Sequence, residues 1–211
     1  MLLTPIDFAS DWGVSDLVRL QMVADPADLP ASELTFLATT GLPALIRYSP
    51  GVSEAVVTFC RLRRGVTKAI DEPIVGGPLS SEWDHYWVIG DEYFCNGSAW
   101  WCINAVTGTL ERIDIELDHP ILFVNTSIRH FASALVVALN CVSHGDTVEE
   151  WRSRLAHLEA KLVELDPQIV IHSRSFWRSY LDFIRDEQPR KCPIERGSLE
   201  QGNQALQNGP W

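Results

Sequence analysis

The spacing of apolar residues changes along the chain, from short runs that suit strands to a helical repeat in the last third. Residues Ala55 to Leu62 are β-branched and apolar, which predicts a strand. Tyr86 to Ile89 and Tyr93 to Cys95 on one side, and Ala99 to Ile103 on the other, flank Asn96-Gly97. An Asn-Gly pair between such runs is typical of a tight hairpin turn, so antiparallel pairing is expected here.

Two further apolar runs extend this pattern. A turn at Thr107-Gly108 leads into Thr109 to Ile115, and Ile121 to Val124 follows after a short polar stretch. Consecutive strands joined by short turns predict a mostly antiparallel meander.

Helical spacing begins after Val124. Asn125, Thr126 and Ser127 are N-cap residue types, and apolar residues then recur at helical intervals from Ile128 to Val142. Thr147 and Glu150 form a capping-box pattern that opens a second helix. Its apolar stripe is Val148, Trp151, Leu155, Leu158, Leu162 and Leu165, and Pro167 ends it. Fewer than three full heptads favour ordinary core packing of this stripe over a dimerisation seam.

A last helix is expected to carry Phe176, Trp177, Tyr180, Leu181 and Ile184. Strands followed by helices predict an α+β fold, in which a mostly antiparallel central sheet packs against helices.

The two ends of the chain carry weaker patterns. The first thirty residues, rich in Asp, Pro and Ala, are interpreted as a capping segment. Ser32 is expected to cap a short helix that ends at Gly41-Leu42-Pro43, and Ile74 to Ser81 is expected to be a loop. The apolar content falls after Arg185. The sequence thus predicts one domain over residues 1–186, with its core at 31–185, and a flexible tail over 187–211.

Composition narrows the classes of function. The 211 residues are 46% hydrophobic and 21% charged, as in an ordinary globular protein, with a net charge of −11. That charge argues against nucleic-acid or anionic-membrane binding and suits a basic protein partner. The five cysteines form no Cys-x-x-Cys, and neither a secretory signal nor a membrane span is visible. We therefore expect reduced thiols and a cytoplasmic location.

The acidic residues are concentrated in one stretch. Between Asp71 and Asp118 there are ten acidic residues and one basic residue, a net charge of −9, together with seven aromatic residues. The aromatic side chains can form the buried face of the sheet and the carboxylates its solvent-exposed face. Alternatively, both form a surface that binds a basic partner, with Asp91 and Glu92 in a turn. The candidate partner-binding residues are Glu82, Trp83, Asp84, Asp91, Glu92, Tyr93, Asp114, Glu116 and Asp118.

No pattern of a known catalytic site is present. His-Glu-x-x-His, a phosphate-binding loop and Gly-x-Ser-x-Gly are all absent, and the six histidines are scattered. Asp114, Glu116 and Asp118 would share one face of a strand, where they could hold Mg²⁺ or Ca²⁺ for a hydrolase. A solvated acidic face is the simpler interpretation. The sequence therefore predicts no catalytic residue, metal or cofactor.

Several short motifs, in order, resemble those of the SUKH superfamily and, within it, the bacterial immunity proteins. They are Thr40-Gly-Leu-Pro43, Trp87-Val-Ile-Gly-Asp91, Trp101-Cys-Ile-Asn104 with Thr107-Gly-Thr-Leu110, and Phe123-Val-Asn-Thr-Ser-Ile128 with Phe131. The similarity covers about residues 31 to 185. Two positions depart from the usual motifs: Asn104 stands where Asp is frequent, and Asn125-Thr-Ser-Ile128 replaces an Asn-Ser-Ser-Leu-like sequence.

The resemblance implies an α+β domain that binds and neutralises a cognate toxin, often a nuclease, and that is not an enzyme. It transfers no contact residue, because binding surfaces in the family vary with the toxin. A regulatory or scaffolding module of the same superfamily, with a non-toxin partner, is the alternative. A metal-dependent hydrolase is a third and more distant reading.

Overall fold

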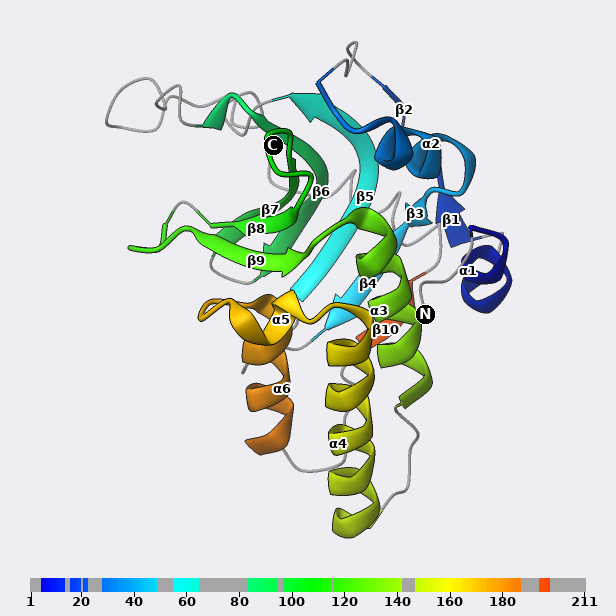
Figure 1. Ribbon diagram of the computed structural model, residues 1–211, viewed down its shortest axis with the longest axis vertical. Helices are drawn as coiled ribbons and strands as arrows, with labels where there is room; N and C mark the ends of the chain where they lie inside the picture. The colour runs from blue at the N-terminus through cyan, green and yellow to red at the C-terminus, as the bar shows by residue number, and fades with distance from the viewer. Residues whose placement is uncertain are drawn as a thin grey trace.

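The computed structural model describes residues 5–13, 16–19, 21–22, 28–48, 55–64, 83–94, 97–114, 116–141, 147–186 and 194–197. Within them, a curled antiparallel sheet lies against a group of helices, and α3 (Ile128–Cys141), α4 (Val148–Leu165) and α6 (Phe176–Asp186) stand side by side (Figure 1). This arrangement confirms the predicted α+β class. The loop expected at Ile74 to Ser81 lies outside the described residues.

The main sheet has the strand order β10-β4-β5-β6-β7-β8-β9, and each pair of neighbours is antiparallel. The strands are β4 (Leu45–Tyr48), β5 (Ala55–Arg64), β6 (Tyr86–Phe94), β7 (Gly97–Asn104), β8 (Leu110–Ile113), β9 (Ile121–Asn125) and β10 (Ile194–Gly197). A short strand β2 (Gln21–Met22) pairs parallel to β5, and β1 (Leu17–Val18) pairs with β3 (Leu42–Pro43) in a separate ribbon. From β5 to β9 the order follows the chain, which confirms the predicted meander.

The β6–β7 hairpin is more continuous than expected. Its two predicted apolar runs, which begin at Tyr86 and at Tyr93, belong to one strand that ends at Phe94 and bulges beside Gly90. Cys95, the last residue of the second run, lies outside the described residues. A Cβ atom at Gly90 would lie 2.8 Å from Cδ1 of Phe59, so the missing side chain lets the Phe59 ring pack on the strand. Asp91 and Glu92 are therefore strand residues, and their placement in a turn was wrong.

Helix starts are set by specific polar contacts. Ser127 caps α3, since its Oγ accepts from the backbone N–H of His130 at 3.2 Å. The capping box at Thr147 and Glu150 is present at the start of α4, as predicted. The helix α2 (Ala31–Thr39) begins one residue before Ser32, and Pro30 is its N-cap residue without a side-chain hydrogen bond. The expectation that Ser32 caps this helix was therefore wrong.

The N-terminal segment belongs to the core. Phe8 and Trp12 in α1 (Pro5–Trp12) are fully buried, and the Phe8 ring lies 5.9 Å from that of Phe36 in α2. Near the other terminus, β10 pairs with β4. For these four residues the pairing corrects the expectation of a flexible tail; the rest of 187–211 lies outside the described residues.

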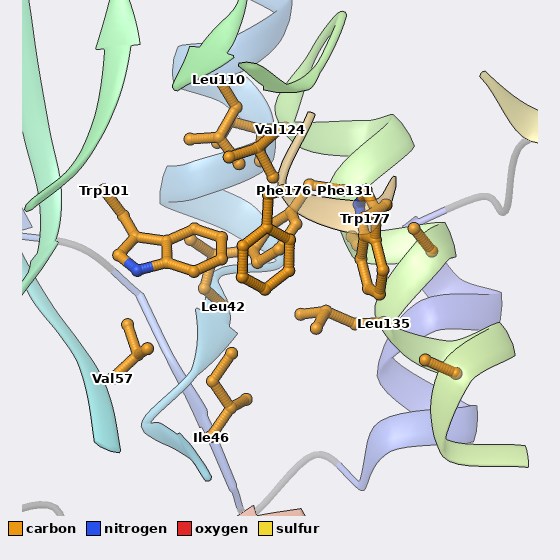
Figure 2. Packing of buried hydrophobic residues seen from close by; sticks show 14 of the residues in the cluster. Leu42, Ile46, Val57, Trp101, Leu110, Val124, Phe131, Leu135, Phe176 and Trp177 are labelled. Atoms are coloured by element: carbon orange, nitrogen blue, oxygen red, sulfur yellow. The ribbon is translucent and has the colours of Figure 1, made fainter. Parts of the chain in front are cut away.

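The main core lies between the sheet and the helices. Trp101 of β7 faces Phe131 of α3 and Phe176 of α6, with ring centroids 5.2 Å and 4.9 Å away. Figure 2 shows the Phe176 ring between Trp101 on the strand side and Trp177 on the helix side. Four residues of the predicted α4 stripe, Trp151, Leu155, Leu158 and Leu162, are buried in the same cluster, as their spacing predicted. Of the other two, Val148 is 46% exposed and Leu165 is half-buried.

A polar network fixes how the helices meet the sheet. Asn125, at the end of β9, accepts a hydrogen bond from Nε1 of Trp177 at 2.9 Å and donates one to Asp166 at 3.0 Å. Asp166 ends α4 and also accepts from the backbone N–H of Thr126 at 2.8 Å. Because each of these buried groups has a partner, the network joins β9, α4 and α6 at little desolvation cost.

Candidate partner-binding surfaces

The predicted binding residues do not all reach the surface. Glu92 is fully buried on the face of the sheet that meets the helices. Its carboxylate accepts from Nε1 of Trp101 at 2.7 Å and from Nε and Nη2 of Arg112, both at 2.8 Å. A carboxylate held by three donors inside the core contributes to the fold and offers no charge to a partner.

The surroundings of Arg112 favour its charged form. Burial alone would lower the pKa of Arg112, but the hydrogen bonds and charge of Glu92 raise the pKa above its usual range. Burial also raises the pKa of the Tyr48 phenol well above its ordinary value, and the negative charge of Glu92 adds to that shift. Tyr48 therefore stays neutral beside the Glu92 carboxylate.

The aromatic residues of the acidic stretch are mostly buried. Successive side chains on a strand point to opposite faces. Trp87, Trp101 and Ile103 accordingly join the main core, while Trp100 and Cys102 pack on the other side of the sheet. We call this second group the outer cluster. It consists of Trp83, Tyr86, Val88, Trp100, Cys102 and Ile113.

Trp83 was expected to be an exposed anchor for a partner, but it is only 8% exposed within the outer cluster. Tyr93 is half-buried, and Glu82 lies outside the described residues. The alternative in which the aromatic rings form a core is therefore correct for Trp83, Tyr86, Trp87, Trp100 and Trp101. The number of aromatic residues in the sequence could not reveal this burial, because the sheet buries both of its faces here.

A second polar group lies at the start of β6. The Tyr86 hydroxyl donates to Glu111 at 2.6 Å, and burial together with this hydrogen bond raises the pKa of Tyr86 above its usual range. Glu111 also accepts from Oγ1 of Thr109 at 2.7 Å. Glu111 is thus occupied in holding β6 and β8 together.

Asp114, Glu116 and Asp118 do not share a strand face. The strand β8 ends at Ile113, and Asp114 turns inward, with its carboxylate 3.7 Å from Nη2 of Arg112. Glu116 and Asp118 are exposed in the turn that leads to β9. The arrangement proposed for a Mg²⁺ or Ca²⁺ site was therefore wrong. Among the residues that the structure describes, no cluster of three or more His, Cys, Asp or Glu side chains could hold a metal ion.

The remaining acidic candidates divide between two ends of the sheet. Asp91 is half-buried and pairs with Trp100, which pairs in turn with Ile113. Asp91 therefore lies at the same end as Glu116 and Asp118. The exposed Asp84 lies in the turn before β6 at the opposite end, and five residue steps of strand, ~17 Å, separate Tyr86 from Asp91. The strand register thus places Asp91 toward the end of the sheet that carries Glu116 and Asp118, and Asp84 at the opposite end.

A second surface was not found from the sequence. A cavity of about 320 Å³ opens between α4, α6 and the short helix α5 (Gln168–Ile171). We call it the helical groove. Its signal in the sequence is Ile169-Val-Ile171, an apolar run that follows Pro167 and Gln168 and was not assigned to any element. No helix among the described residues has the length and hydropathy to cross a membrane.

Comparison with known proteins gives one match. The model of the family described as SUKH-4 immunity protein matches residues 4–183. The match begins well before residue 31, where the similarity inferred from the motifs begins, and so takes in α1 with its buried Phe8 and Trp12. No curated protein and no solved structure gives a significant match.

Proposed function

Because the chain belongs to the SUKH-4 immunity protein family, we propose that it binds and neutralises a cognate bacterial toxin. The observation that carries this proposal is the family match, which spans residues 4–183 and includes the whole sheet from β4 to β9. The proposed action is stoichiometric: the protein covers a functional surface of the toxin and performs no chemical step.

The chemistry of the partner follows from the charge of this chain. The stretch from Asp71 to Asp118 has a net charge of −9, and the strand register places Asp91 toward the end of the sheet where Glu116 and Asp118 are exposed. A basic toxin surface would be attracted to this end over long range. Nucleases bind a polyanion and therefore carry basic active surfaces, so a nuclease toxin fits this chemistry best.

The proposed place of action is the bacterial cytoplasm. Cys102 is a buried free thiol, which is compatible with a reducing compartment. A toxin that enters or is made in the cytoplasm would be met there before it reaches its target.

Co-expression tests the function directly. A toxin domain encoded beside this gene is expressed in a sensitive host with and without the protein, and growth is scored. We expect the protein to restore growth, and the exposed-surface variant His157→Asp to do the same. The variant Leu158→Asp, which disrupts the core, should fail. If the wild-type protein binds the toxin and growth still fails, the family role gives way to the regulatory or scaffolding alternative.

A further inference from the structure

The strand β10 lies outside the part of the chain that matches the family. The match ends at residue 183, within α6, whereas β10 comprises Ile194–Gly197. It nonetheless joins the main sheet, where it lies antiparallel beside β4 (Figure 1). Within the matched residues, β4 is therefore the last strand on this side of the main sheet, and β10 is an addition to its edge.

The edge of β4 is suited to pairing with another strand. Three of its four residues, Leu45, Ile46 and Tyr48, are at most 3% exposed in the structure. An uncovered edge strand of this kind presents a row of backbone donors and acceptors beside large apolar side chains, and such strands tend to pair with other chains. The opposite edge of the sheet is partly closed, since the backbone N–H of Phe123 in β9 donates to the carbonyl of Arg174 at 3.1 Å.

The strand β10 is a poor template for further pairing. It has only four residues, of which Glu195 and Arg196 are charged, and Pro193 precedes it in the sequence. Short length, charge and a nearby proline are features by which natural proteins protect the edges of their sheets. Pairing with β10 thus replaces an apolar edge by a short and charged one.

We propose that β10 protects the edge of β4 and prevents it from pairing with the β4 strand of a second copy of this chain. An antiparallel strand can pair with its own copy about a two-fold axis, so a closed dimer joined through two β4 edges is the contact that β10 excludes. This role concerns the edge of the sheet and does not depend on the toxin-binding function.

The register shows which backbone groups of β4 face β10. The N–H of Phe59 in β5 donates to the carbonyl of Ala44 at 3.1 Å, directly before β4. In an antiparallel ladder the backbone groups of successive residues point to alternate sides. The N–H of Ile46 therefore points toward β5, and those of Leu45 and Arg47 point toward β10.

The same alternation holds on β10. Glu195 pairs with Arg47 and Gly197 pairs with Leu45. The N–H groups of Glu195 and Gly197 therefore point toward β4, and the N–H of Arg196, between them, points away. Two neighbouring residues of one short strand thus differ in whether their N–H group contributes to the cover.

Proline substitutions in the full-length protein test the proposal, because proline has no N–H. Glu195→Pro removes a group that faces β4 and should release β10. The matched control Arg196→Pro changes a group that faces away and should leave β10 in place. Glu195→Gln removes the charge alone and should behave as wild type. Circular dichroism checks that each variant is folded, and Gly197→Pro repeats the test at the other inward-facing position.

Hydrogen exchange, followed by NMR at a concentration where each variant is monomeric, measures the cover. In Glu195→Pro we expect the amides of Leu45 and Arg47 to exchange at least about tenfold faster than in wild type, while that of Ile46 is unchanged. Sedimentation should show that Glu195→Pro dimerises at least about tenfold more tightly than wild type or Arg196→Pro. In that dimer the amides of Leu45 and Arg47 should regain their protection.

Four results would overturn the proposal. Unchanged exchange of Leu45 and Arg47 in Glu195→Pro would show that β10 does not cover β4 in solution. Self-association of Glu195→Pro no tighter than that of wild type or Arg196→Pro would show that pairing with β10 plays no part. A dimer in which Leu45 and Arg47 still exchange fast would place the contact elsewhere. Loss of folding in both Glu195→Pro and Gly197→Pro would make β10 a requirement of the fold instead of a cover for its edge.

Discussion

Glu92 of β6 and Arg112 of β8 form a two-pronged buried ion pair across the intervening strand β7, with both N–O distances at 2.8 Å. The indole of Trp101 on β7 donates to the same carboxylate, so one acidic residue joins three strands. The pair lies in the middle of the most acidic stretch of the chain. Because the pair is buried, the acidic stretch contains two kinds of carboxylate: those that stabilise the sheet and those that are exposed and can contact a partner.

The first prediction concerns the stability that depends on this pair. Glu92→Gln removes the negative charge and leaves the Arg112 guanidinium uncompensated in the core. We expect a loss of about 3–5 kcal/mol in the free energy of unfolding, measured by urea denaturation. The exposed control Glu116→Gln should stay within about 0.5 kcal/mol of wild type. A loss below about 1 kcal/mol for Glu92→Gln would show that water or another group compensates Arg112.

The second prediction concerns association with a basic toxin. Reversing Glu116 and Asp118 to Lys together should slow association severalfold, because both carboxylates are exposed at the acidic end of the sheet. The association rate of the wild-type complex should also fall with added salt, while its dissociation rate changes less. Stopped-flow fluorescence measures both rates.

The control for this experiment keeps the same change in net charge. Glu149 and Glu164 are exposed on α4 and can be reversed to Lys together. If this control slows association as much as the variant at Glu116 and Asp118, overall charge governs the encounter. The acidic end of the sheet would then have no special role.

Local patterns predicted the elements of the fold. The Asn96-Gly97 pair located the hairpin, and Thr147 with Glu150 located the start of α4. Tight turns and helix caps form between residues that are close in sequence, so their patterns can be read locally. Exposure was harder to predict. Alternation along β6 and β7 shows that side chains divide between two faces of the sheet, but it does not show that both faces are covered. Both are covered in the structure, because Trp101 is buried in the main core and Trp100 in the outer cluster.

The candidate site was predicted only in part for the same reason. Glu92 and Glu116 are the same residue type in the same acidic stretch, yet one is buried against Arg112 and the other is exposed. That difference arises from the pairing of β6, β7 and β8, which is a long-range property. The helical groove was missed because its lining comes from three helices and its short helix α5 has only four residues.

The third prediction tests the packing of α4. Leu158 is fully buried in the main core, whereas His157 beside it is exposed. Leu158→Asp places an unpaired charge in the core and should cost several kcal/mol, enough to unfold a domain of ordinary stability. His157→Asp should melt near the wild-type temperature by circular dichroism. A folded Leu158→Asp protein would contradict the placement of α4.

The fourth prediction concerns acid stability at the start of α4. The backbone N–H of Thr147 donates to the Glu150 carboxylate at 2.8 Å, and this hydrogen bond lowers the pKa of Glu150 from its ordinary 4.5. A lowered folded-state pKa means that the stabilisation is complete above the unfolded-state pKa and is lost as the pH falls through the folded-state pKa. Glu150→Gln should therefore destabilise the protein at neutral pH and reduce the loss of stability on acidification below about pH 4.5. Thermal melts over a pH series measure this, and parallel curves for the two proteins would contradict it.

Inhibition of the toxin at known concentrations tests the central claim most directly. The purified toxin domain encoded beside this gene is assayed on its substrate while this protein is added in increasing amounts. The account predicts that activity falls linearly to a plateau near one equivalent, because a binding inhibitor acts by stoichiometric coverage. Full inhibition at a small fraction of an equivalent would indicate catalytic inactivation. Undiminished activity at excess protein would contradict the proposed neutralisation.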